Sequence, residues 1–266
     1  MLQSRIQRRM PERLSHYTNK EALKSILSDQ EGKGICMRAF SNRCKNDEQE
    51  IRMGEYMLKR IINAYSFPQG SLLHQIRDYD NTASISFMEG EVNQHMLDVY
   101  GHYRLEFDLR ELGVGLFSRG LIDCEYVPES KLVEYVNEYC EMISSTYKSI
   151  PVLQKKYGKF SAQPINNLFG FIQMELDVMG KVFCLKEQQW SEEREWRMVF
   201  GLNDNADIHY HNEKPYVKCY IDKKKLTGIT IFCTSGTIDK AHEDAREISD
   251  YISVRGYNTK VKIEVF

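Results

Sequence analysis

A strand pattern, a helix pattern and a second strand pattern follow one another at the C-terminal end of the sequence, and this order limits the folds that the chain can adopt. Residues 229–233 and 261–265 are apolar in the way typical of strands, and Ala241, Ala245 and Ile248 between them keep helical spacing. A helix that connects two strands of one sheet in this way normally makes them parallel. We therefore expect a sheet with one crossover unit at this end of the chain.

The rest of the sequence mixes strand and helix patterns. Residues 82–127 alternate polar and apolar side chains as strands do, and we expect an antiparallel meander there with a turn at Gly113 and Gly115. Ahead of it, Thr18 and Glu21 match a capping box, which predicts a helix capped by Thr18. Further helices are expected after Asn46 or Asp47 and at about 130–147 and 165–183, and further strands at 14–17, 35–40, 193–200 and 216–221.

These patterns predict an α+β fold: a mixed, largely antiparallel split sheet with flanking helices and a two-helix insertion at about 130–185. The chain has 266 residues, of which 42% are hydrophobic and 28% are charged, a composition typical of ordered globular proteins. Neither a linker-like stretch nor an internal repeat divides the sequence. We expect one domain over residues 1–266.

Charge and cysteine content narrow the partners and the compartment. Lys and Arg number 36 against 38 Asp and Glu, so the net charge of −2 indicates no nucleic-acid partner, although a local basic patch stays open. No run approaches the ~18 apolar residues of a membrane helix, and the first residues lack the apolar block of a signal peptide. The seven cysteines show no C-x-x-C spacing, which indicates neither a disulfide framework nor a zinc site. We expect a cytoplasmic protein without a membrane partner.

The segment 190–200, W-S-E-E-R-E-W-R-M-V-F, carries the strongest local signal for chemistry. On a strand that begins at Glu193, period-two geometry puts Glu193, Glu195 and Arg197 on one face and Trp196 on the other. Adjacent carboxylates repel each other and a guanidinium relieves the repulsion, which separates their pKa values as an acid/base pair requires. We expect the three charged side chains to line a surface or a cleft. The alternative is a solvated charge ladder without chemistry.

Two more groups of polar and aromatic residues stand beside predicted strands. His16, Tyr17 and Thr18 lie between a strand and a helix, where side chains can face a ligand and free backbone N–H groups can bind phosphate. The alternative is that Thr18 only caps the helix and His16 only packs. The other group, which can stack on flat rings or bury a sheet face equally well, comprises Ser84, Ser86, Tyr100 and Tyr103.

A polar loop before the second predicted helix contains Asn46, Asp47 and Glu50. Such residues usually cap a helix or lie in its first turn, where a negative charge suits the helix dipole. Alternatively, Asp47 and Glu50 join Glu193 and Glu195 around Mg²⁺ in a metal-dependent phosphodiesterase. We favour the capping role and predict no metal site.

Taken in order, these segments resemble the prokaryotic domain-of-unknown-function family 2971 over nearly the whole chain. The most specific match is the late W-x-x-E-x-E-W-R motif, which is complete from Trp190 to Arg197. The family's N-D-P-x-E loop has Glu48 in place of proline, and its M-W-x-x-Y segment keeps Tyr100 but has Leu97 in place of tryptophan. The resemblance implies a fold without an established activity, and its members' proximity to mobile and defence genes implies a defence or toxin effector. The remaining matches are His16-Tyr17-Thr18, Ser25-Ile26-Leu27 and Ser84-Ile85-Ser86-Phe87.

The same order of motifs is more distantly similar to the ADP-ribosyltransferases, which bind NAD in a small split sheet and cleave its glycosidic bond. This resemblance implies that Glu195 stabilises the oxocarbenium-like transition state through the ribose 2′-OH, and that Glu193, beside Arg197, orients the acceptor. A second assignment uses Arg13 and a serine in place of the histidine and the tyrosine. The resemblance also implies that NAD is a substrate and that the acceptor is a macromolecule. The residues implied to hold NAD are His16, Tyr17, Thr18, Ser84, Ser86 and Tyr100 or Tyr103.

Three classes of function therefore stay open. An ADP-ribosyltransferase-like enzyme would take NAD, a small-molecule nucleotide. A metal-dependent phosphodiesterase would need its acidic residues to converge beside a lysine. A non-enzymatic sensor or interaction module would keep Glu193, Glu195 and Arg197 as a structural network of ion pairs.

Overall fold

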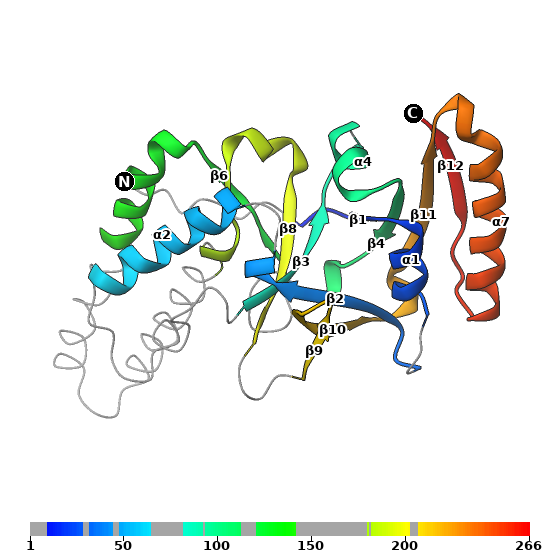
Figure 1. Ribbon diagram of the computed structural model, residues 1–266, viewed down its shortest axis with the longest axis horizontal. Coiled ribbons are helices and arrows are strands. Elements are labelled where there is room, and N and C mark those ends of the chain that lie inside the picture. Colours follow the sequence, from blue (N-terminus) through cyan, green and yellow to red (C-terminus); the bar gives the residue numbers. More distant parts are fainter. Residues whose placement is uncertain are drawn as a thin grey trace.

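The computed structural model describes residues 10–28, 32–44, 48–64, 82–92, 94–112, 121–141, 180, 182–202 and 207–266. Most of these residues form one large twisted sheet with helices along its flanks, as Figure 1 shows. None of the described helices is both long enough and apolar enough to cross a membrane.

The strands of the described chain form a large, mostly antiparallel sheet and a small parallel pair. The order of the large sheet is β12-β11-β4-β1-β3-β2-β10-β9, and β8 pairs with both β3 and β5. The small pair consists of β6 (Glu125–Val127) and β7 (Leu185–Glu187). The strands of the large sheet are β1 (Leu14–Thr18), β2 (Ile35–Ser41), β3 (Thr82–Met88), β4 (Tyr103–Phe107), β5 (Leu121–Asp123), β8 (Glu195–Gly201), β9 (Ile208–His211), β10 (Lys214–Ile221), β11 (Leu226–Cys233) and β12 (Val261–Val265).

Within the described ranges, four labelled α-helices frame this sheet, and residues 132–141 are helical as well. A 3₁₀ helix, η5 (Gln188–Glu193), leads directly into β8. The four helices are α1 (Lys20–Ile26), α2 (Glu48–Ala64), α4 (Gln94–Tyr100) and α7 (Ile238–Val254).

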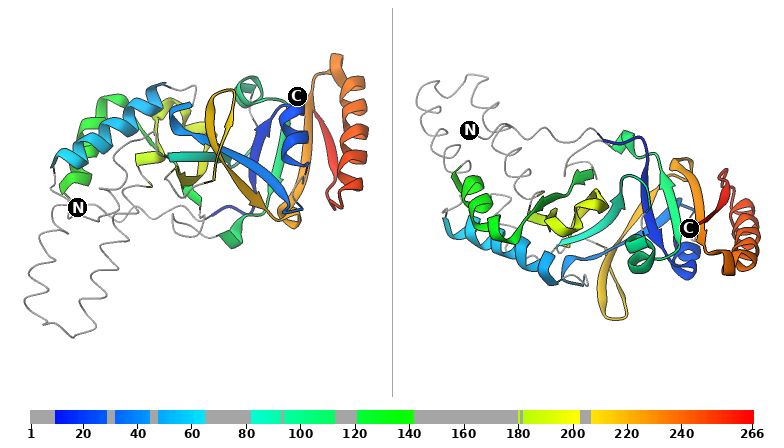
Figure 2. Two further views of the ribbon diagram at one scale, coloured as in Figure 1. Left: turned by 60° about the horizontal axis from the view of Figure 1, so that its bottom comes forward. Right: turned by 90° about the horizontal axis from the view of Figure 1, so that it is seen from above.

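The sheet divides at β3. Along one edge, β3 pairs with β8 throughout its length. Its other edge is shared, because β1 meets it at Met88 and β2 meets it at Ala83 and Ser84. The sheet therefore forks into one arm of β1, β4, β11 and β12 and a second arm of β2, β10 and β9, and Figure 2 shows the two arms diverging.

Alternation of side chains explains which face each strand buries. In β2, Ile35, Met37 and Ala39 are buried while Arg38 between them is exposed. The apolar run of β11 is buried almost throughout, because β4 and β12 flank the strand and α7 lies beside it (Figure 1). The buried residues by which α7 joins the core are Ala241, Ile248 and Ile252.

Several expectations from the sequence are confirmed. The fold is α+β with a mixed, largely antiparallel sheet and flanking helices. At the C-terminal end, β11 and β12 are parallel neighbours with α7 between them in the sequence, so the predicted crossover unit is present. Residues 132–141 are helical within the first of the two predicted insertion helices.

Two local expectations are wrong. Helix α1 is capped by Asn19, whose side chain accepts a hydrogen bond from the Ala22 N–H, while Thr18 ends β1 as a buried strand residue. Residues 82–127 do not form a simple meander, because α4 interrupts the strands and β1 lies between β3 and β4 in the sheet. Local alternation reports that a segment is a strand but not which strand pairs with it.

Some predicted features fall on residues that are not described. The expected caps Asn46 and Asp47, the expected turn at Gly113 and Gly115, and nearly all of the second insertion helix lie outside the described residues.

A buried polar contact ties the first and last helices to the sheet. Asp244 of α7 accepts a hydrogen bond from the Tyr103 hydroxyl at 2.6 Å and from Lys20 Nζ at 2.5 Å. Burial acts to raise the pKa of Asp244, but the bonds from Lys20 and Tyr103 outweigh it, and the pKa lies below its ordinary value. The charged form of Asp244 therefore stabilises the folded state.

Replacing Asp244 with asparagine should lower the free energy of unfolding by about 1–3 kcal/mol at neutral pH, because a charge-assisted acceptor is lost. Since the folded-state pKa is depressed, this contribution is present above the unfolded pKa of about 3.9 and disappears as pH falls through the folded value. Urea unfolding at several pH values should show the variant approaching the wild type in strong acid. A matched control is Glu247→Gln, an exposed partner of the same Lys20, which should change the midpoint little. Equal losses in both variants would contradict the assignment.

Candidate functional site

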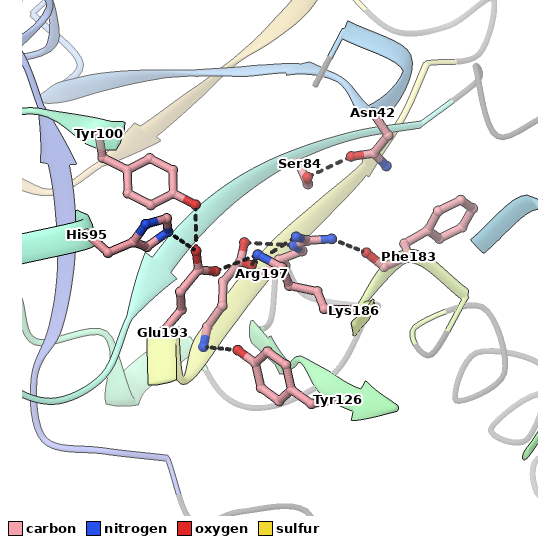
Figure 3. Close-up of polar contacts among 10 residues, drawn as sticks. Asn42, Ser84, His95, Tyr100, Tyr126, Phe183, Lys186, Glu193 and Arg197 are labelled. Carbon is pink, nitrogen blue, oxygen red and sulfur yellow. Dashed lines mark hydrogen bonds and ion pairs between the residues drawn. The ribbon is translucent and has the colours of Figure 1, made fainter. Parts of the chain in front are cut away.

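The site begins with an ion pair on β8. Glu195 and Arg197 point to the same face of the strand and are each 1% exposed. The Arg197 guanidinium donates from Nε to Glu195 Oε1 at 2.8 Å and from Nη2 to Oε2 at 2.9 Å, a two-point pair (Figure 3). Its third nitrogen, Nη1, donates to the Phe183 carbonyl at 2.8 Å. The expected charged face therefore exists, but it is buried, and the solvated ladder is excluded.

Lys186 of β7 adds a second cation, and it connects the two carboxylates. Its Nζ donates to Glu195 Oε2 at 2.9 Å and to Glu193 Oε2 at 2.5 Å. Lys186 and Glu193 are 4% and 2% exposed. We call Lys186, Glu193, Glu195 and Arg197 the charge cluster, in which two cations and two carboxylates balance.

Glu193 reaches the cluster by a route that the sequence pattern did not predict. It is the last residue of η5, and β8 begins only at Glu195, so the expectation of a strand starting at Glu193 is wrong. Between them, Arg194 adopts a left-handed conformation with φ of 45°. This reversal turns the chain from η5 into β8, and the Glu193 carboxylate meets Lys186 from the helix end instead of from the strand face.

Aromatic side chains surround the Glu193 end of the charge cluster. The Tyr100 hydroxyl donates to Glu193 Oε1 at 2.9 Å, and His95 Nε2 lies 3.8 Å from the same oxygen (Figure 3). The His95 ring also packs on the Trp190 ring, with centroids 4.9 Å apart and planes at 32°. Although its Nε2 is buried and makes no hydrogen bond, the His95 side chain as a whole is 40% exposed. The half-exposed His95 side chain therefore lies beside the Glu193 end of the charge cluster.

The neighbouring acidic hydroxyl and thiol groups stay protonated. Burial raises the pKa of Tyr100, with the Lys186 charge opposing this effect, so Tyr100 is a hydrogen-bond donor to Glu193. Burial likewise raises the pKa of Tyr126, whose hydroxyl oxygen accepts the Glu195 backbone N–H at 2.8 Å. Burial also raises the pKa of the Cys124 thiol well above its ordinary value. A buried neutral thiol is a poor nucleophile, so Cys124 is a weak candidate for nucleophilic chemistry.

Ser84, Ser86 and His16 lie close to the cluster along β3. Ser86 pairs with Arg197 across β3 and β8, and its carbonyl bonds His16 Nδ1 at 3.0 Å, where the two arms of the sheet diverge. The Ser84 hydroxyl donates to Asn42 Oδ1 at 2.7 Å, and Asn42 Nδ2 donates to Thr82. His16 therefore fills the fork of the sheet one strand away from Arg197.

Other predicted site residues lie elsewhere. Tyr103 bonds Asp244 of α7, and Tyr17 packs in a separate apolar cluster in which its ring stacks on Phe232. Thr18 ends β1 as a buried residue. Of the two tyrosines proposed to face a ligand, the structure thus brings only Tyr100 into contact with the charge cluster.

Sequence reasoning missed Lys186, His95 and Tyr126. Lys186 lies on a strand of three residues, too short for a periodic signal, and it meets Glu193 at the end of η5, which directly follows β7. Among the described residues, no group of three or more His, Cys, Asp or Glu side chains could hold a metal ion. Asp47 lies outside them, and the Glu50 side chain is not described.

Comparison with known proteins adds no relative: no family model, no curated protein and no solved structure matches the chain. The resemblance to the domain-of-unknown-function family stays a prediction from the motifs.

Replacing Lys186 with methionine tests the charge balance of the cluster. The variant keeps the length of the side chain but leaves two buried carboxylates with one cation, so the free energy of unfolding should fall by about 3–5 kcal/mol. The measurement is urea unfolding followed by circular dichroism. Lys240→Met, at an exposed lysine of α7, is the matched control and should leave the midpoint nearly unchanged. If both variants unfold at the same urea concentration, the cluster is not buried as described.

Replacing His16 with glutamine tests whether its imidazole is buried and neutral at the point where the two arms of the sheet diverge. Burial lowers the pKa of His16, with the bond to the Ser86 carbonyl opposing the effect. A lowered folded-state pKa means that the unfolded chain binds more protons, so wild-type stability is full above about pH 6.5 and falls as pH drops below it. The glutamine variant should lose less stability between pH 7 and pH 5 than the wild type does. Identical pH profiles in thermal unfolding would contradict a buried neutral imidazole.

Proposed function

We propose that the chain binds NAD beside Glu193 and cleaves its nicotinamide–ribose bond. The observation that supports this proposal is the position of Glu193, which bonds Tyr100 and Lys186 and lies beside the ring pair of His95 and Trp190. Flat rings next to a carboxylate suit a pyridinium ring on a ribose. The rings can stack on the pyridinium, and the carboxylate can stabilise the positive charge that develops on the sugar.

In the proposed reaction, the bond between ribose C1′ and the pyridinium nitrogen breaks and its electron pair goes to nitrogen, so neutral nicotinamide leaves. The ribose becomes an oxocarbenium-like cation, which Glu193 stabilises. The hydroxyl oxygen of water or of a macromolecular acceptor then bonds to C1′, and its proton passes through the Glu193 carboxylate to solvent. Glu195 and Arg197 act as positioning residues. Glu195 bonds Lys186, which in turn bonds Glu193 at the end of η5, and Arg197 holds the Glu195 carboxylate.

The energetics of the charge cluster favour a functional role. Removing several charges from water costs more than packing apolar residues of the same size in their place, and such replacements are often neutral or stabilising. Buried carboxylates beside a lysine, a tyrosine and the half-exposed His95 belong to the class of arrangement that active sites use.

A structural role for the cluster is the second candidate. Glu195 accepts two bonds from Arg197 and one from Lys186, so its carboxylate is almost saturated with donors inside the fold. In this candidate the ion pairs hold η5, β7 and β8 together in a sensor or interaction module, and no bond is made or broken.

The test is release of nicotinamide from NAD by the purified chain. Glu193→Gln should lower the rate by about 100-fold or more, because it removes the charge that meets the transition state. Tyr100→Phe should also lower it, since the Glu193 carboxylate loses its hydroxyl partner. Tyr251→Phe is the matched control: its hydroxyl bonds the Lys24 carbonyl far from the cluster, and the rate should not change.

Two outcomes separate the candidates. If the wild type neither binds NAD at millimolar concentration nor releases nicotinamide, while Glu193→Gln unfolds more easily by over about 1 kcal/mol, the cluster is structural. If Glu193→Gln keeps the wild-type melting temperature and binds NAD without releasing nicotinamide, the carboxylate acts in catalysis.

A further inference from the structure

The arm of the sheet formed by β2, β10 and β9 presents a row of cations and rings. In β10, Lys214, Tyr216, Lys218 and Tyr220 occupy alternate positions, so all four share one face, and Val217, Cys219 and Ile221 face the core. In β2, Arg38 and Phe40 lie opposite Lys218 and Tyr216 on that same face. The residues that define this surface, named the basic–aromatic face, are Arg38, Phe40, Lys214, Tyr216, Lys218 and Tyr220.

The β9–β10 hairpin carries this face away from the rest of the described chain, as the right-hand view of Figure 2 shows. Its turn consists of Asn212 and Glu213, both with positive φ, 47° and 65°. Two such residues between antiparallel strands match the twist of the hairpin and fix its register. The alternation of cations and rings is thus held on a rigid strand pair.

Rings and cations interleave on the basic–aromatic face. The Tyr216 ring lies 5.3 Å from Phe40 and 5.4 Å from His209, with the His209 plane at 29° to it. The Arg38 guanidinium sits over the Tyr216 ring at 5.3 Å, and Lys33 Nζ sits over the Tyr220 ring at 5.2 Å. Arg38 and Lys33 therefore lie against aromatic rings, and the face offers positive charge and stacking area in the same place.

The pairing of β10 with β2 brings two cations of the basic–aromatic face side by side. Lys218 lies directly opposite Arg38, and like charges in directly opposite positions destabilise a sheet. The two cations sit among aromatic rings, on the side of the arm turned away from its core. Cations and rings gathered on one face in this way are complementary to a polyanion that also carries flat groups.

We propose that the basic–aromatic face binds single-stranded nucleic acid. The cations of Arg38, Lys214 and Lys218 contact phosphates, and the rings of Phe40 and Tyr220 stack on bases. Residues that share a face of a strand repeat every ~6.8 Å, which sets a regular alternation of cation and ring along β10. The formal net charge of −2 for the whole chain does not conflict with this, because a group of neighbouring cations attracts an anion locally. This proposal does not depend on the NAD reaction.

The rings favour a single strand over other polyanions. A duplex buries its bases, whereas a single strand exposes their flat faces for stacking on aromatic side chains. An acidic peptide, a polysaccharide polyanion or an anionic lipid surface would use only the cations. The contribution of the rings to the binding affinity therefore distinguishes a single strand from these other polyanions.

The test is fluorescence anisotropy with labelled oligothymidylate of about 20 nucleotides, longer than the roughly 4–16 nucleotides that a single-strand-binding module of this size covers. The expected dissociation constant lies between about 10⁻⁶ and 10⁻⁴ M at physiological salt. The double variant Lys214→Gln/Lys218→Gln should flatten the slope of log K against log salt by about 1.4, since each phosphate contact contributes about 0.7. Tyr220→Leu should weaken binding about tenfold without changing that slope.

The matched control is Lys260→Gln/Lys262→Gln, which removes the same charge from exposed positions at β12 and should leave both affinity and slope unchanged. Melting temperatures confirm that each variant folds. Oligouridylate in a second arm shows whether the 2′-OH matters, and a duplex of equal length should bind more weakly.

Three results would overturn the proposal: no binding at 50 mM salt, equal loss in the control variant, or heparin and phosphatidylserine vesicles bound as well as the oligonucleotide with no effect of Tyr220→Leu. Because Lys214, Lys218 and Tyr220 do not touch the charge cluster, nicotinamide release should be the same in all these variants. Failure of this proposal is therefore distinguishable from failure of the proposed NAD reaction.

Discussion

A buried two-point ion pair between Glu195 and Arg197 holds the centre of this protein together. The two residues are neighbours on one face of β8, and at this buried position each supplies hydrogen-bond partners to the other. The pair also fixes the register of β8 against β3, because a slip of one residue would move Trp196 into the charged side and both charges into the apolar core. The third guanidinium nitrogen extends the constraint to the Phe183 carbonyl, and Lys186 extends it to β7.

The two ends of the charge cluster differ, and the difference decides where chemistry can occur. At the Arg197 end, donors and acceptors are matched within the fold. At the Glu193 end, the partners are a neutral hydroxyl from Tyr100, a shared lysine and the half-exposed His95, so the charge of this carboxylate is less completely met (Figure 3). A ligand that supplies positive charge would be drawn to Glu193 first, which is why the proposed role in NAD cleavage passes from Glu195, favoured by the motif, to Glu193.

The sequence predicted the elements well and their neighbours less well. Alternation along β8 correctly separated Trp196 from Glu195 and Arg197, because that periodicity is a local property of a strand. It did not predict that both faces of β8 are buried, since β5 and β6 come from an earlier part of the chain and β7 is too short to show a periodic pattern. The left-handed conformation of Arg194 ends η5 and places Glu193 outside the strand. Nothing in the sequence of the motif indicates this reversal of the chain. Similarly, Tyr100 and Tyr103 are equivalent by pattern, and only the topology sends one to Glu193 and the other to Asp244.

The fork at β3 relates the two proposed sites to each other. Residues directly opposite one another in an antiparallel sheet share a face, so the register connects His209, Tyr216, Phe40, Ser84 and Val199 in one row across β9, β10, β2, β3 and β8. Ser86 and Arg197 occupy the next row of that same face. The basic–aromatic face and the charge cluster therefore lie on the same side of the sheet, although they belong to different strands. A macromolecule that binds the β9–β10 arm is thus held on the side of the sheet that carries the carboxylates, which is the arrangement that a group transfer from a nucleotide to a bound acceptor requires.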